Sequence, residues 1–219
     1  LYASFMPKPK YGMCGSGMHI NMSLFNKEGQ NIFVDENDKN GLSKEAYNFI
    51  AGLMKHMRSM TAIINPIVNS YKRLVPGYEA PTYIAWSATN RSPLIRVPAA
   101  RGLGTRVELR SPDCATNPYL AIAVCLAAGL DGIKNNLQPV DSIQRDIYSM
   151  TDEERDEAGI ENLPKNLYEA IQEMRKSDFV KGVLGKEVFK KYIKAKEEEW
   201  MEYTSQVTDW EIDRYLGRI

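Results

Sequence analysis

The sequence lacks the patterns that define several classes of protein. It contains no run of 18 apolar residues, so it predicts no membrane-spanning helix and no membrane partner. Its three cysteines form no CxxC pair, which excludes a small disulfide scaffold and favours reduced thiols in a cytoplasmic protein. Its two histidines form no HExxH motif, which excludes a zinc protease. Neither GxSxG nor a Walker-type phosphate loop occurs, so a serine hydrolase and a P-loop nucleotide site are not expected.

What the chain contains is typical of a globular protein. Hydrophobic residues make up 43% and charged residues 26% of its 219 residues, without low-complexity tracts. This composition excludes disorder and predicts a buried core. The chain starts with Leu1 rather than Met and shows no signal-peptide pattern. We therefore expect a piece of a longer polypeptide, which carries part of a site.

The net charge is zero, but the charge is unevenly distributed. Residues 1–110 contain 14 basic and seven acidic side chains, whereas residues 111–219 contain 14 basic and 21 acidic ones. In residues 73–110 every basic side chain is a guanidinium, which binds carboxylate or phosphate through paired hydrogen bonds. This favours a small anionic ligand over surface salt bridges or a nucleic-acid patch, since such patches usually mix lysine with arginine. The six arginines are Arg73, Arg91, Arg96, Arg101, Arg106 and Arg110.

The hydrophobic periodicity predicts an α+β fold that becomes mainly helical toward the C-terminus. Ser43 and Thr151 are expected to cap helices, and Pro118 to open a strongly apolar one. The segment 73–81 places two prolines around a glycine and is predicted to be a shaped loop. Strands are predicted over 18–25, 94–98 and 105–110, and helices from 43, over 60–71, 117–134, 165–177 and 186–203, and from 208 to the end.

Two of the predicted strands carry unusual rows of polar side chains. Imidazole and carboxylate groups are ligands for divalent metals, and neighbouring arginines would neutralise phosphate or carboxylate. The alternatives are a satisfied surface histidine and a salt bridge from Glu108 to Arg106 or Arg110. The other histidine, His56, is expected to be structural. The rows are His19, Asn21 and Ser23 in the first strand and Arg106, Glu108 and Arg110 in the second.

Several sequence blocks resemble glutamine synthetase, and in particular the type I enzymes of bacteria and archaea. The resemblance spans residues 1 to about 135 in several specific blocks and continues more loosely through the tail. In order, the blocks are FMPKP at 5–9, GSGMH at 15–19, NSYKRLVPGYEAP at 69–81, NRS at 90–92 and RVELR at 106–110.

The resemblance implies a ligase of nitrogen metabolism. Enzymes of this family phosphorylate the side-chain carboxylate of glutamate with ATP, and ammonia then displaces phosphate from γ-glutamyl phosphate to give glutamine. The family site is a funnel that ATP enters from one end and glutamate from the other, with Mg²⁺ or Mn²⁺ between them. The resemblance supplies these substrates; the composition predicts only small anions.

The resemblance also implies a role for individual residues. His19 and Glu108 match ligands of the metal that bridges the ATP phosphates. Arg91 is expected to stabilise the transferring phosphoryl group. Glu79 is expected to close the site against water and to accept a proton from the ammonium adduct. The ATP-binding set is Asn21, Ser23, Arg91, Arg96 and Arg106, and the glutamate-binding set is Gly15, Arg73, Glu79 and Arg110.

This sequence departs from the family pattern at three positions. Cys14 stands where many members have Asn, and Asn21 where many have a second histidine, although Asn also occurs in the simpler type I branch. Tyr148 aligns loosely with a tyrosine that some members adenylylate, but its surroundings lack the expected context and we expect no modification there. The features fit the branch that glutamine inhibits by feedback.

The resemblance implies that these residues are the C-terminal catalytic region only. Residues 1–135 would form the second half of the catalytic barrel, with antiparallel strands backed by helices, and 136–219 a helical region of the same domain. The family's N-terminal β-grasp domain and the first half of the barrel would lie outside the sequence. Since a neighbouring subunit supplies part of each family site, we expect the isolated chain to be inactive.

Two other functions remain open at this stage. The first is a ligase of the same fold that joins glutamate to a polyamine or another amine. The second is a non-catalytic module for oligomerisation or for binding a transcription regulator. In the family enzyme, a dodecamer of two hexameric rings, the helix at 210–219 would dock between rings; packing within the chain is the alternative. No direct nucleic-acid contact is expected.

Overall fold

The computed structural model describes residues 1, 3–90 and 92–218, and its centre is a small mixed sheet. The strand order is β1-β5-β4-β3, and β5 pairs antiparallel with both β1 and β4. β3 and β4 pair in parallel, beside the antiparallel pairs that the sequence predicts. The strands are β1 (Ile20–Met22), β3 (Trp86–Ser87), β4 (Ile95–Arg96) and β5 (Val107–Leu109).

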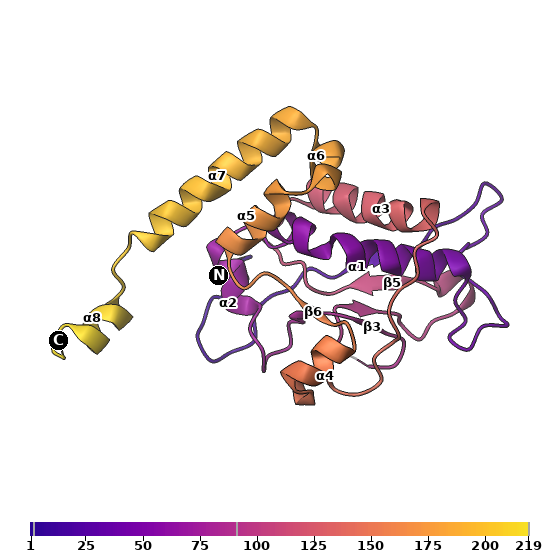
Figure 1. Ribbon diagram of the computed structural model, residues 1–219, viewed down its shortest axis with the longest axis horizontal. Coiled ribbons are helices and arrows are strands. Elements are labelled where there is room, and N and C mark those ends of the chain that lie inside the picture. The colour runs from indigo at the N-terminus through magenta and orange to yellow at the C-terminus, as the bar shows by residue number, and fades with distance from the viewer. Residues whose placement is uncertain (2, 91, 219) are drawn as a thin grey trace.

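Two long helices cover the sheet and form the core with it. Figure 1 shows α1 (Lys44–Ile64) and α3 (Pro118–Lys134) side by side along the sheet. Both begin where the sequence predicts. The Ser43 side chain accepts a hydrogen bond from the backbone N–H of Ala46, and Asn117 caps α3 with Pro118 in its first turn.

Glycines allow α1 and α3 to approach each other closely. A Cβ added at Gly52 of α1 would lie 2.1 Å from the backbone oxygen of Ala128 in α3. In the reverse direction, a Cβ at Gly132 would lie 2.0 Å from the backbone oxygen of Asn48. Because the obstructing atoms belong to helix backbones, no side-chain rotation relieves either contact. The spacing of the two helices therefore requires glycine at both positions.

The helix predicted over 60–71 is divided differently in the structure. α1 continues to Ile64, and α2 (Val68–Arg73) starts after a break at residues 65–67. Pro66 has no N–H and disfavours helical geometry at the residue before it. Asn65 accordingly leaves the helix and donates from Nδ2 to the backbone oxygen of Ser111 at 2.8 Å.

The C-terminal region, residues 136–219, shares a sheet and a core with residues 1–135. β2 (Tyr83–Ile84) pairs antiparallel with β6 (Glu161–Asn162), and α5 (Leu167–Arg175) packs against α1. The helices capped by Thr151 and Thr208 and the long charged helix are present as predicted. Beyond the predicted elements, β2, β3, β6, α6 and two 3₁₀ turns also form. The remaining elements are α4 (Asp152–Glu157), α6 (Asp178–Leu184), α7 (Lys186–Thr204), α8 (Asp209–Tyr215), η1 (Gly102–Gly104) and η2 (Ile147–Ser149).

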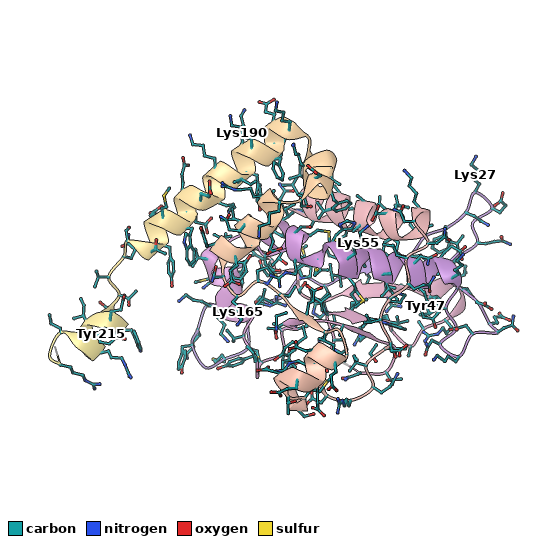
Figure 2. The ribbon with its side chains drawn as sticks, viewed as in Figure 1. Lys27, Tyr47, Lys55, Lys165, Lys190 and Tyr215 are labelled. Atoms are coloured by element: carbon teal, nitrogen blue, oxygen red, sulfur yellow. The ribbon has the colours of Figure 1, made fainter. Side chains whose placement is uncertain are left out.

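The last helix lies at the outer end of the C-terminal region. α7 packs against α2, α5 and α6, and α8 lies beyond its end (Figure 1). Figure 2 places Tyr215 of α8 at the opposite end of the molecule from Lys27. Trp210 is 62% exposed and Leu216 79% exposed, and no residue of α8 is buried. The sequence left open that this helix packs within the chain. The described residues of α8 do not show such packing.

His56 has the structural environment that was expected. It lies in α1, stacks on the ring of Phe179 in α6 at 3.7 Å between centroids, and has its Nε2 2.8 Å from Asp131 of α3. None of the helices in the described ranges is long and apolar enough to cross a membrane.

The glycine contacts between α1 and α3 yield the first prediction. Gly52→Ala in the native polypeptide forces the two helix backbones apart and lowers the free energy of unfolding by about 3 kcal/mol. The matched control is Gly182→Ala in α6, where an added Cβ meets nothing within 4 Å. That change raises stability by about 0.5–1 kcal/mol because alanine is the better helix former. Urea denaturation checks both, and equal stability of the two variants would contradict the role of Gly52.

Candidate active site

Glu108 lies at the centre of the candidate site. It occupies the middle of β5, where the strand register places Asn21 of β1 on one side and Arg96 of β4 on the other. The residue is only 6% exposed. The site is therefore built on adjacent sheet strands, which hold its side chains in fixed order.

Both oxygens of the Glu108 carboxylate face charged or ionisable groups. Oε1 lies 2.9 Å from Nδ1 of His19, just before β1. Oε2 lies 2.6 Å from Nε of Arg96, an ion pair that lacks hydrogen-bond geometry. The alternative predicted from sequence was a salt bridge to Arg106 or Arg110, whereas the short ion pair is made by Arg96. The register explains this, because Arg96 and Glu108 are directly opposed residues of neighbouring strands.

The side chains of His19 and Glu108 fit part of a divalent metal site. Imidazole nitrogen and carboxylate oxygen are both suitable ligands, and His19 and Glu108 present one of each within 2.9 Å. Glu108 Oε2 is buried and has no hydrogen bond, so it also retains acceptor capacity. Among the described residues, no group of three or more His, Cys, Asp or Glu side chains is placed to hold a metal ion. This chain thus offers two ligands, fewer than a complete site needs.

Arg106 and Asn21 form a second polar contact on the same face of the sheet. Nε of Arg106 donates to Oδ1 of Asn21 at 2.9 Å, and Nη1 donates to the backbone oxygen of Gly104. Asn21 and Ser23 also line a cavity of about 270 Å³ whose other walls include Phe49 and Ile122. Of the predicted ATP-binding residues, Asn21, Ser23 and Arg106 therefore lie along β1 and its partner strand. Arg91 lies outside the described residues.

All four residues predicted to bind glutamate line one cavity. It measures about 130 Å³, which is small beside the pockets of about 300–1,000 Å³ that hold drug-sized ligands. His19 forms part of the same wall, so this cavity adjoins the Glu108 cluster. The lining residues are Gly15, Gly17, His19, Arg73, Tyr78, Glu79, Ala80 and Arg110.

The cavity contains two largely buried arginines. Arg73 is 5% and Arg110 7% exposed, and burial lowers the pKa of both guanidinium groups. Nη1 of Arg73 donates to the backbone oxygen of Ser111 at 2.6 Å, and Nη1 of Arg110 donates to that of Pro93 at 3.4 Å. Carbonyl oxygens carry only partial charge, so the contact to Ser111 leaves the Arg73 cation able to attract an anion.

Two glycines make room for the Arg73 side chain. A Cβ at Gly17 would lie 2.5 Å from Nη2 of Arg73, and one at Gly15 would lie 3.1 Å from Cγ of Arg73. Gly15 was predicted as a site residue from the family resemblance. Gly17 was not, although it belongs to the same GSGMH block, which is the signal that points to it.

Lys8 is a site-forming residue that the sequence reasoning missed. It is buried, and its Nζ lies 3.9 Å from the centre of the Tyr78 ring and donates to the backbone oxygen of Met13. Its own backbone N–H and C=O both bond to the side chain of Asn69 in α2. Lys8 thereby joins the N-terminal segment to the loop that carries Glu79. Its place in the FMPKP block was the available signal.

Comparison with known proteins identifies the family. The sequence matches the family described as glutamine synthetase, catalytic domain, over residues 1–215. It is 62% identical over 218 residues to a glutamine synthetase of Clostridium saccharobutylicum and 58% identical over 218 residues to one of Methanosarcina mazei. These alignments cover 100% of this chain, but 49% and 48% of the relatives.

Solved structures agree with the sequence comparison. A GmaS complex with ADP superposes with a TM-score of 0.85 at 37% identity, over 98% of this chain and 49% of that one. GmaS without ligand superposes with a TM-score of 0.84 at 38% identity, over 97% of this chain and 48% of that one. The fold is thus that of a glutamine synthetase-type enzyme, and the α+β prediction is confirmed. The chain belongs to the glutamine synthetase catalytic-domain family, and it spans about half the length of the relatives it matches.

The cysteines of the site and the core are predicted to react differently. Cys14, beside Gly15, is exposed, whereas Cys125 in α3 is buried and its pKa is raised to about 12 by desolvation. Because the thiolate is the reactive form, iodoacetamide at about pH 8 modifies Cys14 in the folded native polypeptide and leaves Cys125 intact. Peptide mapping by mass spectrometry checks this, with urea-unfolded protein as the control. Equal labelling of both residues in the folded state would contradict the burial of Cys125.

Proposed function

We propose that this chain is the C-terminal part of a glutamine synthetase active site, in an enzyme that makes glutamine from glutamate, ammonia and ATP. One observation carries the proposal. His19 belongs both to the Glu108 cluster and to the wall of the cavity that holds Arg73 and Arg110. A phosphoryl-transfer site and a dicarboxylate site thus adjoin, as a reaction between ATP and glutamate requires.

The arginine cavity is the proposed glutamate site. Arg73 and Arg110 bind the carboxylates of glutamate, and the Gly15 backbone contacts the amino acid. Burial supports this role because an ion pair formed in a desolvated pocket is screened less than one at the surface. Glu79, in the loop above, closes the site and accepts a proton when the ammonium adduct forms.

The face around β1 is the proposed nucleotide side. Asn21, Ser23 and Arg106 contact ATP, and Arg96 and Arg91 neutralise its phosphates, with Arg91 stabilising the group in transfer. The likeness to a GmaS complex with ADP supports a nucleotide at this fold. His19 and Glu108 would hold Mg²⁺ or Mn²⁺ together with ligands from outside these residues. When bound, the ion polarises the phosphoryl group.

The reaction then proceeds in two steps. The glutamate side-chain carboxylate attacks the γ-phosphorus of ATP, and ADP leaves. Ammonia attacks the acyl carbon of γ-glutamyl phosphate, and inorganic phosphate leaves with the C–O bond electrons. During these two steps the arginines hold the reacting groups in line. Glu79 removes the extra proton from the nitrogen of the ammonium adduct as the amide forms.

The assembly is proposed from the family and from the exposed C-terminal helix. We infer a cytoplasmic homo-oligomer, a dodecamer of two hexameric rings, of the branch that glutamine inhibits. The three large apolar side chains that α8 exposes, together with the adjacent Leu216, support its insertion into a partner subunit. The same surface is also proposed to contact a transcription regulator. We also propose that the chain is part of one domain. In it, residues 1–135 form the second half of the catalytic barrel and residues 136–219 form its helical region.

Product analysis tests the proposed reaction. The native polypeptide that contains residues 1–219 is supplied with ATP, Mg²⁺ and glutamate, with ammonia in one sample and a polyamine in the other. We expect glutamine with ammonia only, and no turnover by residues 1–219 alone. A product with the polyamine only would move the assignment to a related amine ligase. No product with either amine would favour the non-catalytic module.

A substitution tests the glutamate site separately. Arg73→Lys keeps the positive charge but loses the planar pair of donors, and it is expected to raise the KM for glutamate about 10- to 100-fold. The KM for ATP stays near its original value. Arg58→Lys is the matched control, because Arg58 lies on α1 and faces the surface carboxylates Glu161 and Glu173. An unchanged KM for glutamate in Arg73→Lys would remove Arg73 from the site.

A further inference from the structure

The loop that carries Glu79 is attached to the body by side chains on either side of it. It runs from the end of α2 to β2 without a helix or strand, and Gly77 in it has a positive φ of 87°. Lys8 holds Tyr78 by its cation–π contact. On the other side of Glu79, the hydroxyl of Tyr148 donates to the backbone oxygen of Ala80 at 3.1 Å. Tyr148 therefore reaches this loop from a segment 68 residues away.

The backbone of Tyr148 is itself firmly held. It lies in η2, where the Asp146 side chain accepts a hydrogen bond from the N–H of Tyr148. On either side of it, Ile147 and Met150 are buried in a small core with Tyr83 and Ile160. A turn anchored at both ends in this way can serve as a fixed support for its side chain.

Arg155 fastens the same turn from α4. Its guanidinium donates to the backbone oxygens of Ile147 and Met150 and lies 4.8 Å from the centre of the Tyr83 ring. Tyr83 in turn contacts the Tyr148 ring edge-on, at 5.6 Å between centroids. Burial raises the pKa of the Tyr148 hydroxyl, so it stays protonated and able to donate near neutral pH. The Tyr148 ring packs against Tyr83, whereas its hydroxyl bonds to Ala80, so a substitution can remove the bond and keep the packing.

We propose that Tyr148 is a positioning residue that holds the Glu79 loop closed over the Arg73–Arg110 cavity. Its hydroxyl fixes Ala80, which lines the cavity next to Glu79. The inference rests on the proposed function. Without the hydroxyl, the Tyr78 side of the loop stays attached through Lys8, and the Ala80 side is free to open.

An open loop has a definite chemical consequence. Water enters and its oxygen attacks the acyl carbon of γ-glutamyl phosphate. The bond between the acyl carbon and the bridging oxygen breaks, and inorganic phosphate leaves with that oxygen and the bond electrons. The attacking water releases its proton to the solvent, and glutamate is regenerated. ADP and phosphate are then formed without glutamine, so the ratio of glutamine to phosphate measures closure directly.

The test compares two tyrosines that make the same kind of bond. Tyr148→Phe, in the native polypeptide, keeps the ring and removes the bond to Ala80. Tyr192→Phe is the matched control, because the Tyr192 hydroxyl donates to the backbone oxygen of Ala62 at 2.7 Å, between α7 and α1. We expect phosphate release without glutamine to rise about three- to tenfold in Tyr148→Phe, and the control to stay coupled like the unmodified enzyme.

A second measurement does not depend on turnover. Chymotrypsin should cut after Tyr78 faster in folded Tyr148→Phe than in Tyr192→Phe. Full coupling together with unchanged cleavage in Tyr148→Phe overturns the inference, and equal uncoupling of both variants overturns it too. If the unmodified enzyme makes no glutamine, the proposed function has failed, and that result is distinct because it appears before any substitution.

Discussion

The site depends on the register in which β5 lies between β1 and β4. This register sets Glu108 opposite Asn21 and Arg96, and β1 also brings His19 to the same carboxylate. A shift of one residue would turn Glu108 to the other face of the sheet and put Val107 or Leu109 in its place. The buried apolar neighbours of Glu108 resist such a shift, since both are fully enclosed in the core. The packing of Val107 and Leu109 on one face of β5 thus fixes the position of Glu108 on the other.

The elements that the sequence predicts correctly are those specified by local signals. Ser43 and Asn117 mark helix starts through their own caps, and the alternation around Glu108 marks a strand. The role of Arg73 came from the family resemblance, and the structure places it in the same cavity as Arg110. The ion-pair partner of Glu108 was missed because it depends on which strands become neighbours, and the sequence does not state that order. β2 and β6 were missed for a similar reason, since two-residue strands have no period to detect.

In the arginine cavity, the protein itself holds the Arg73 guanidinium in place. Neighbouring carbonyl oxygens and close glycine backbones surround Arg73, so the guanidinium is oriented before any ligand arrives. Burial has already removed most water from it and lowers its pKa. The desolvation and ordering costs are therefore met during folding, which leaves more of the electrostatic attraction available for binding.

The exposure of α8 has a consequence for how the end of the chain is stabilised. α8 has seven residues and no buried side chain, and a helix that short is marginal in water. Its capping box at Thr208 contributes only local support. A surface that covers Trp210 and Leu216 would supply the missing free energy. The helical content of this last segment then follows mass action: it rises with protein concentration and falls on dilution, while the core around α1 does not respond.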